Sequence, residues 1–139
     1  MRNLALVLLA VVLLPALVTG CGTRSYADGT YRGTSGPDDD GAVGEVTLTI
    51  TEGKIAACVF VTRQKDGSVK DEQYGKINGE ISNQSYYEKA QLAVDAMKKY
   101  AADLGRAGSL DGVEAVSGAT VSYNQFSEAV EEALEQAVK

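Results

Sequence analysis

The sequence of 139 residues has no histidine, no tryptophan and only two cysteines. Without histidine it lacks ligands for imidazole-bound zinc and histidine-ligated haem, and it cannot form Ser-His-Asp or Cys-His catalytic sites. Its acidic residues show no metal-ligand spacing, and its lysines and arginines form no basic run that could neutralise nucleic-acid phosphates. These absences argue against most standard hydrolases and predict neither a bound metal nor a nucleic-acid partner.

A glycine-rich fingerprint for dinucleotides, Gly-x-Gly-x-x-Gly at the start of a helix, is missing as well, so no nicotinamide site is expected. Three adjacent aspartates, Asp38, Asp39 and Asp40, suggest calcium. They lack the alternation and the distal glutamate of an EF-hand loop. We interpret them as a solvated turn within a loop expected over 35–41.

The N-terminus has the pattern of an export signal, with a positive start at Arg2 followed by an apolar run over 4–18. Residues 18–21 have the sequence VTGC and fit a lipobox. We therefore predict cleavage before Cys21 and acylation of its thiol, which would hold the new N-terminus in the outer leaflet of a bacterial membrane. The alternatives are an ordinary secretory peptide or an uncleaved anchor, although the apolar run is short for a spanning helix and contains Pro15.

Removal of the lipoprotein signal peptide, residues 1–20, leaves 119 residues, the usual size of one domain. We assign 21–27 to the lipidated cysteine and a short tether, and 28–139 to a single domain. The mature chain then has 12 basic and 19 acidic residues, a net charge of −7. With Cys21 lipidated, Cys58 has no disulfide partner, and we interpret it as a small buried hydrophobe.

The clearest secondary-structure signal is a β-hairpin. From residue 44 to residue 51, apolar and hydroxyl residues alternate, which predicts a strand with one buried face. A tight reversal at 52–53 leads into a more continuously apolar strand over 54–64. A short segment is expected over 30–32, and an ordered loop over 70–84.

Two amphipathic helices are expected in the second half of the chain. The first has Ser85 as its N-cap and Glu88 in a capping box, and it runs to about Leu104. The second starts at Ser122, with Gln125 at the box position. The apolar faces comprise Tyr86, Ala90, Ala93, Val94, Met97, Tyr100, Ala101 and Leu104, and then Phe126, Ala129, Val130, Ala133, Leu134, Ala137 and Val138. Early strands and late helices predict an α+β fold, a small antiparallel β-sheet with both helices packed on it in one domain.

Thr120 stands just before the second expected helix. Its hydroxyl would lie near the unpaired amides of the first helical turn, where a phosphate is electrostatically favoured. Gly118 and Ala119 leave room for a bulky group to approach the backbone. These residues predict an anion site, with a plain Ser/Thr-rich turn as the alternative.

Residues 117–120 have the sequence SGAT, 28–33 have DGTYRG, 52–55 have EGKI, and 70–76 have KDEQYGK. These stretches resemble the FMN-binding domain family, the last of them its small lipoprotein branch. The resemblance implies that a flavin transferase moves FMN from FAD onto the hydroxyl of Thr120 and forms a phosphoester. The residues that complete the motif are Ser117, Gly118 and Ala119.

The resemblance extends to Glu114, six residues before Thr120. The family usually has aspartate there, and Glu114 keeps the carboxylate on a side chain one methylene longer. The resemblance implies that Glu114 belongs to the motif recognised by the flavin transferase. We also expect Ser122 among the cofactor-binding residues.

Tyrosines are the next candidates for cofactor binding, because a flavin ring gains by stacking on flat apolar surfaces. Tyr74 in a glycine-flanked loop and Tyr123 beside the attachment turn are the first candidates, with plain packing as the alternative for each. Tyr86 is expected in the core, whereas Tyr87 turns off the apolar helix face and is expected to be exposed.

Together these features suggest a membrane-anchored, extracytoplasmic electron carrier with covalent FMN, itself a substrate of the flavin transferase and not an enzyme. Without a nicotinamide site, its electrons would pass to and from redox proteins or quinones. The alternative is a lipoprotein that binds flavin or another small solute reversibly, without a redox role. A purely structural surface lipoprotein is a third hypothesis.

Overall fold

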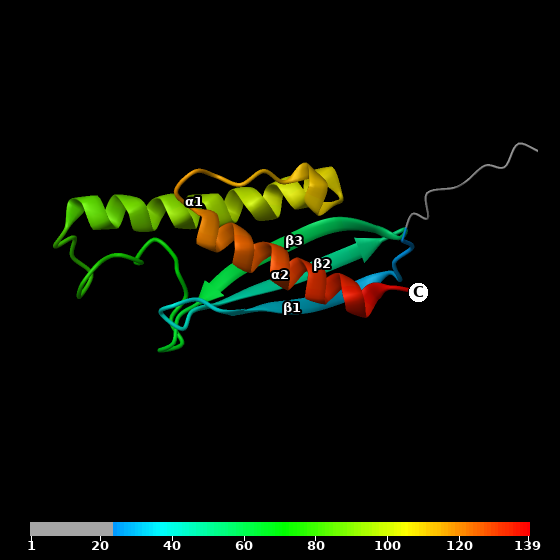
Figure 1. Ribbon diagram of the computed structural model, residues 1–139, viewed down its shortest axis with the longest axis horizontal. Helices are drawn as coiled ribbons and strands as arrows, with labels where there is room; N and C mark the ends of the chain where they lie inside the picture. The colour runs from blue at the N-terminus through cyan, green and yellow to red at the C-terminus, as the bar shows by residue number, and fades with distance from the viewer. Residues whose placement is uncertain (1–23) are drawn as a thin grey trace, which may run out of the picture.

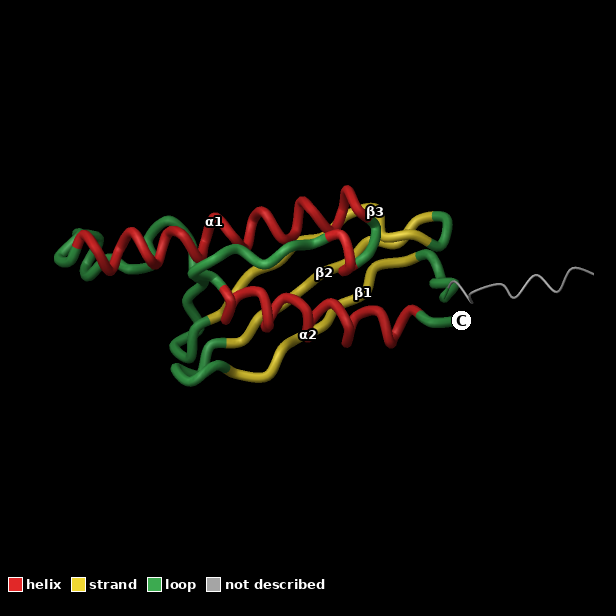
Figure 2. Tube along the Cα trace, turned by 45° about the horizontal axis from the view of Figure 1, so that its top comes forward, coloured by secondary structure: helices red, strands yellow, loops and turns green. Residues whose placement is uncertain are grey.

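Three antiparallel strands in the order β1-β2-β3 form the sheet of the computed structural model, which describes residues 24–139. The elements are β1 (Gly29–Pro37), β2 (Val43–Thr51), β3 (Lys54–Arg63), α1 (Gln84–Ala107), the short 3-10 helix η1 (Leu110–Gly112) and α2 (Thr120–Ala137). Both long helices pack on one face of the sheet (Figures 1 and 2), so the predicted α+β fold is confirmed. The expected signal peptide and Cys21 lie outside the described residues. Within 24–139, no helix has the length and hydropathy needed to span a bilayer.

The β2–β3 hairpin has the predicted pattern. Val46, Leu48 and Ile50 are at most 2% exposed on the helix-covered face, and the threonines between them point to the other face. Glu52 and Gly53 have positive φ angles of 54° and 72°, as a tight two-residue reversal requires. Strand alternation and turn chemistry therefore agree on which face of the sheet is buried.

The first strand is longer than predicted. We expected a short segment over 30–32 and a loop over 35–41, but β1 continues to Pro37 and pairs with β2, with a register shift after Thr34. The residues near Pro37 have the composition of a loop and do not predict a strand. The side chains that bond to the edge of this strand come from α2. Only the turn over 38–42 remains as a loop.

Side chains of α2 bond to the free edge of β1 at three positions, each four residues apart on the helix. The bonds run from Gly36 N to Glu128 Oε2 (3.0 Å), from Thr34 N to Glu132 Oε2, and from Gln136 Nε2 to Arg32 O (2.7 Å). An exposed strand edge with unpaired backbone groups is a template for pairing with another chain. The helix therefore covers the edge that would otherwise invite self-association.

Replacing both Glu128 and Glu132 by alanine should free the amides of the β1 edge. We expect this double variant to form dimers or larger species in excess of the unaltered protein, measured by size-exclusion chromatography with light scattering. Replacing both glutamates by glutamine keeps an oxygen acceptor at each position and should not increase self-association. Equal association of the two double variants would contradict this role for the glutamates.

The first helix differs from the prediction at both ends. Its N-cap is Asn83 instead of Ser85, because the Oδ1 of Asn83 accepts a hydrogen bond from Tyr86 N at 3.0 Å. Asparagine is at least as good an N-cap as serine, so the helix begins earlier and the expected capping box does not form. At the other end, Gly108 adopts a left-handed φ of 74° and its N–H bonds to Leu104 O, which ends the helix after Ala107.

The first turns of α1 extend past the end of the sheet (Figures 1 and 2), and this reverses the expected environments of two tyrosines. Tyr86 was expected in the core but is 54% exposed. Tyr87 was expected to be exposed but is half-buried, and its hydroxyl donates to Glu72 O at 3.2 Å. The helical spacing of Tyr86 is correct, but no sheet lies beneath this part of the helix.

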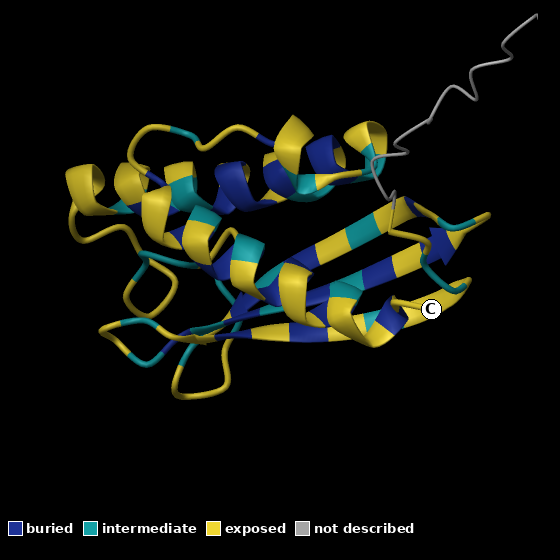
Figure 3. Ribbon diagram, turned by 45° about the vertical axis from the view of Figure 1, so that its right-hand side comes forward, coloured by how far each residue is buried: buried dark blue, intermediate teal, exposed yellow. Residues whose placement is uncertain are grey.

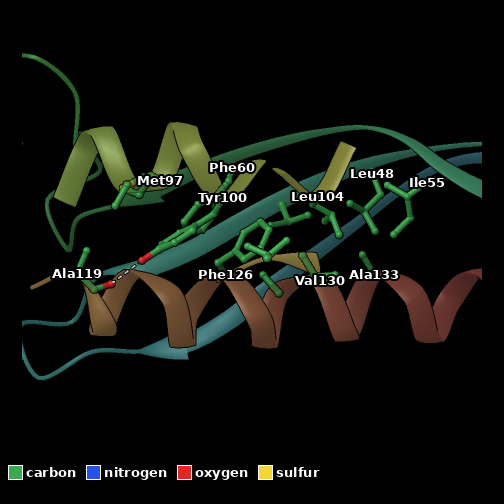
Figure 4. Packing of buried hydrophobic residues seen from close by; sticks show 14 residues of the cluster. Leu48, Ile55, Phe60, Met97, Tyr100, Leu104, Ala119, Phe126, Val130 and Ala133 are labelled. Atoms are coloured by element: carbon green, nitrogen blue, oxygen red, sulfur yellow. Dashed lines mark hydrogen bonds between the residues drawn. The ribbon is translucent and has the colours of Figure 1, made fainter. Parts of the chain in front are cut away.

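The hydrophobic core lies between the sheet and the two helices (Figures 3 and 4). Phe60 and Phe126 meet edge to face with ring centroids 5.1 Å apart. Cys58 packs against this cluster, and burial raises the pKa of its thiol to about 12. The largest fully buried apolar side chains are Tyr100, Phe126, Leu48, Ile50, Leu104, Val46 and Val130.

Candidate functional site

The second helix begins at Thr120. An N-cap at Ser122, as expected, would have made residue 123 the first helical residue, so the helix starts three residues earlier. Ala119 occupies the N-cap position, and Ser122, the expected cap, is buried within the first turn. Gly118 adopts a left-handed φ of 84°, and Ala119 N donates to Val116 O at 3.0 Å. This tight turn reverses the chain directly before Thr120. Because the N-cap residue is an alanine, the helix starts without a side-chain cap.

The start of α2 is suited to an anion. Ala119 makes no side-chain capping bond, and the first turn contains no acidic residue. The first N–H groups of a helix lack intrahelical acceptors, and the aligned dipoles are equivalent to about +0.5 charge at this end. Thr120 is exposed here. Its hydroxyl is therefore open to modification at a point where a phosphate would be stabilised.

Tyr100 of α1 holds the turn that precedes Thr120. Its ring is fully buried, and its hydroxyl accepts a hydrogen bond from Val116 N at 2.9 Å and donates one to Ala119 O at 3.3 Å (Figure 4). One hydroxyl thus joins the two ends of the turn. Sequence analysis assigned Tyr100 to the core but gave no signal for this second role, since both partners are backbone groups.

Replacing Tyr100 by phenylalanine should keep the ring packing and remove the bonds to the turn. Because the partly buried amide of Val116 loses its acceptor, we expect a loss of about 1–2 kcal/mol in the free energy of unfolding, measured with urea. We also expect less flavin on Thr120, because the turn before it is no longer fixed. The control is Tyr31→Phe, which removes a single bond to Ala27 O at the other end of the molecule; an equal loss of flavin in both variants would contradict the role of Tyr100.

Two further contacts fix the turn against the rest of the domain. Tyr123 packs edge to face on Tyr100, with ring centroids 5.4 Å apart, and its hydroxyl donates to Val113 O at 3.2 Å. This half-buried position gives Tyr123 a packing role, and its direct contact with flavin stays a prediction. A Cβ added at Gly118 would lie 3.0 Å from Leu92 Cδ2, so the turn also sits close against α1.

A large hollow lies under the overhanging start of α1. It has a volume of about 560 Å³, and Tyr74, Tyr86 and Ile77 contribute apolar surface to its lining. A neighbouring hollow of about 370 Å³ shares both tyrosines and is also lined by Lys70 and Ala42. The structure therefore brings Tyr74 to a concave surface, as a cofactor-binding role would require, and adds Tyr86 to it.

Tyr74 and Tyr86 lie close enough to affect one another. The pKa of Tyr86 is raised above its ordinary value, first by the neighbouring Tyr74 and then by partial burial. The ammonium of Lys70 lies over the ring of Tyr74, 5.1 Å from its centroid. Two aromatic rings and one cation thus face the same open space.

A smaller hollow of about 250 Å³ lies beside Thr120, lined by Val121, Asn124 and Gln125 of α2 and by residues of the 36–39 segment. Gln125 is only 5% exposed, and its Nε2 donates to Ala42 O at 2.7 Å. Since Ala42 also lines the hollow beneath Tyr86, the two spaces lie on either side of one short loop. Val121 is 57% exposed, an apolar surface directly next to the candidate attachment residue.

Glu114 and Ser117 are both exposed near the start of α2. Glu114 lies in a shallow depression with Lys99 and Arg106, which both pair with the carboxylate of Asp103. These positions leave the expected transferase motif accessible from solvent, whereas Ser122 is buried inside the helix and faces the core.

The fold is similar to the crystal structure of the CPE2226 protein from Clostridium perfringens, with a TM-score of 0.63 and 21% identity over 81% of this chain and 88% of that chain. A solution NMR structure from Clostridium thermocellum matches with a TM-score of 0.48 and 22% identity over 78% of this chain and 90% of that one. No curated protein matches the chain.

The sequence model for the FMN-binding domain matches residues 41–135, a range that includes β2, β3, α1, the turn before Thr120 and all but the last two residues of α2. The match spans more than half of the chain and confirms the resemblance seen in residues 117–120. The protein belongs to the FMN-binding domain family.

Proposed function

We propose that this FMN-binding domain holds its cofactor covalently, as a phosphoester on Thr120. The observation that carries the proposal is the exposed hydroxyl of Thr120 at the first position of a helix without an N-terminal cap. In the attachment reaction, a flavin transferase breaks the pyrophosphate of FAD. The Thr120 oxygen bonds to the phosphorus of the FMN half, AMP leaves, and the hydroxyl proton is released. The remaining phosphate charge is stabilised by the helix dipole.

The residues around Thr120 fit such a group. Gln125 Oε1 is buried and has no hydrogen-bond donor among the described residues, so it can accept a bond from a polar group of the cofactor. Val121 and Leu92 are exposed and supply apolar surface near Thr120, Val121 as its neighbour in the chain and Leu92 through its close approach to Gly118. FMN has a polar phosphate and a flat, largely apolar ring. The helix start at Thr120 suits the phosphate, and the tyrosine-lined hollow suits the ring.

We place the flavin ring in the hollow that contains Tyr74 and Tyr86. The start of α2 lies at the same end of the molecule as the loop over 64–77 (Figure 1), whose residues make up most of the lining of this hollow. Between them, Gln125 of α2 bonds to Ala42 of the 38–42 loop, and Ala42 lines the neighbouring hollow. Lys70 lines the neighbouring hollow, and its ammonium lies over the ring of Tyr74, where it can meet a negative part of the flavin ring. Stacking on two phenol rings is favourable for a flavin.

Replacing Tyr86 by serine should remove one stacking surface from the ring. Because electron transfer from a stacked phenol quenches flavin emission, we expect the fluorescence of the attached FMN to rise several-fold in the variant. Val59→Ser is the control, since Val59 is 60% exposed on the opposite face of the sheet. Emission that is unchanged in Tyr86→Ser, with full flavin content, would contradict this position of the ring.

The cofactor, when bound, supplies the redox chemistry, and the protein anchors, orients and tunes it. We propose that the protein is an electron carrier and a substrate of the transferase, with redox proteins or quinones as donor and acceptor. Lipidation of Cys21 would hold it on the extracytoplasmic side of the cell membrane. A covalent bond suits that location, because a dissociable cofactor would be lost by dilution.

The test is to produce the full chain together with a flavin transferase, unfold it in denaturant and remove small molecules by gel filtration. Flavin absorbance that stays with the unfolded chain supports the covalent carrier. Flavin that is released on unfolding supports the alternative, a lipoprotein that binds flavin reversibly, and overturns the covalent proposal.

A further inference from the structure

The start of the described chain is attached to the far end of α2. Ala27 N donates to Ala137 O at 2.8 Å, and Lys139 N donates to Ser25 O at 3.2 Å. A β-bridge between Tyr26 and Val138 completes this contact. The lipid-bearing segment predicted over 21–27 therefore meets the domain at the C-terminal end of α2.

Thr120 lies at the opposite end of the same helix. With 18 residues and a rise of 1.5 Å per residue, α2 separates the two ends by ~27 Å. The loop over 64–77 and the start of α1 lie at this end of the molecule too (Figure 1), and they supply the lining of the hollow that contains Tyr74 and Tyr86. The domain thus has a flavin end, formed by Thr120 and this hollow, and an anchor end, formed by 25–27 and the last residues of the chain.

The predicted tether is short compared with the domain. Four residue steps lead from Cys21 to Ser25, and a fully extended chain covers at most ~14 Å over that length. This reach is about half the length of α2, so the anchor end must stay near the lipid headgroups. Glu128, Glu131, Glu132 and Glu135 also line the exposed side of α2 between the two ends, and such an acidic side gains nothing from lying on anionic lipid.

We infer that the flavin end faces away from the bilayer and exchanges electrons with a redox protein in the aqueous phase, not with a quinone dissolved in the membrane. This inference rests on the proposed attachment of FMN to Thr120 and of lipid to Cys21. Electrons that leave the reduced cofactor reduce the redox group of that partner protein, and the protons of the reduced ring pass to water. The partner reaches the ring from the side of the 38–42 and 64–77 loops.

Depth in the membrane can be measured by fluorescence quenching on the lipidated, flavinylated full chain. The protein is placed in vesicles of phosphatidylcholine and phosphatidylglycerol that contain spin-labelled lipid, after its covalent flavin has been quantified. If the quantification finds no covalent flavin, the proposed function is overturned, and the result does not bear on the orientation of the domain at the membrane. With flavin present, we expect strong quenching by aqueous iodide and no quenching by spin-labelled lipid; strong lipid quenching overturns the inference.

A variant with its anchor moved to the flavin end provides the control. Cys21→Ser removes the native lipidation site, and Asp39→Cys, in the loop beside Val121, accepts a maleimide lipid. Cys58 should stay unmodified, because burial raises its pKa to about 12 and a thiol reacts as the thiolate. We expect spin-labelled lipid to quench the flavin of this relocated variant strongly, and equal, weak quenching in both proteins would overturn the placement of the flavin at the same end of the molecule as Asp39.

The native protein and the relocated variant also distinguish a membrane quinone from a water-soluble redox protein as the partner. We expect a naphthoquinone dissolved in the vesicle membrane to reoxidise the reduced flavin of the native protein much more slowly than that of the relocated variant. A water-soluble acceptor protein should oxidise the native protein at least as fast as the relocated variant. Reoxidation of the native protein by the membrane quinone at the rate of the relocated variant would make the quinone the partner and overturn the inference.

Discussion

We expect the replacement of Thr120 by alanine to abolish the proposed covalent flavin, which is the largest effect that the candidate site predicts. The variant lacks the oxygen that forms the phosphoester, while the uncapped helix start and the tyrosine-lined hollow remain. Alanine is a good helix former, so the fold should be unchanged. The measurement is flavin fluorescence of the denatured chain on a gel, after production together with the transferase.

Thr120→Ser is the matched control, because it keeps a hydroxyl at the same helical position. We expect it to retain covalent flavin, although in smaller amount if the transferase also contacts the threonine methyl group. Fluorescence that persists in the alanine variant would place the bond on another residue and contradict the assignment. Loss of flavin from both variants together with loss of the folded circular dichroism signal would contradict the expectation that the fold is unaffected.

Replacing Gly33 by alanine should cause the largest loss of stability. A Cβ at this position of β1 would lie 1.9 Å from Ala129 O and 2.7 Å from Ala133 N, both backbone atoms of α2. The helix would have to move away from the sheet, since no side chain can rotate out of the way. Overpacking of a core costs about 1–3 kcal/mol and occasionally more, so we expect a loss of about 3 kcal/mol in the free energy of unfolding.

The thermal midpoint of Gly33→Ala should fall by roughly 10 °C for a domain of this size. Gly36→Ala, in the same strand, is the control, because its Cβ would meet only Glu128 Oε2 at an ordinary 3.7 Å. Differential scanning calorimetry compares the two variants. A similar midpoint for both would contradict the close approach of α2 to β1.

Local patterns in the sequence were sufficient for the β2–β3 hairpin and for the existence of both helices. Alternation from Val46 to Ile50 and the helical spacing of Val94, Met97 and Leu104 reflect contacts with one core, and each pattern repeats within a few residues. Helix boundaries were less certain, because Asn83 and Ser85 are both good caps and only the path of the preceding loop selects one of them.

Non-local contacts decided the features that the sequence did not reveal. β1 extends to Pro37 because glutamates of α2 bond to its edge, and those residues lie in the last helix of the chain. Tyr86 has the helical spacing of a core residue, yet it is exposed because the sheet ends before it. Pattern analysis cannot detect where one element extends past another.

In the candidate site, too, local features could be predicted from the sequence and non-local contacts could not. Residues 117–120 could be identified from their own sequence as a candidate attachment motif, since the four residues are continuous. The support of that motif by Tyr100 and the link from Gln125 to Ala42 could not be predicted, because in both cases a side chain meets backbone far away in the sequence. Sequence analysis therefore located the candidate attachment residue, and the structure added the side chains that hold the turn before it in place.

Mass spectrometry of tryptic peptides from natively expressed, membrane-extracted protein tests the central claim most directly. Trypsin should release residues 107–139 as one peptide, because no lysine or arginine lies between Arg106 and Lys139. We predict that this peptide carries one FMN, joined with loss of one water, and that fragmentation places it on the side chain of Thr120. A bare peptide, or FMN on Ser117 or Ser122, would contradict the account.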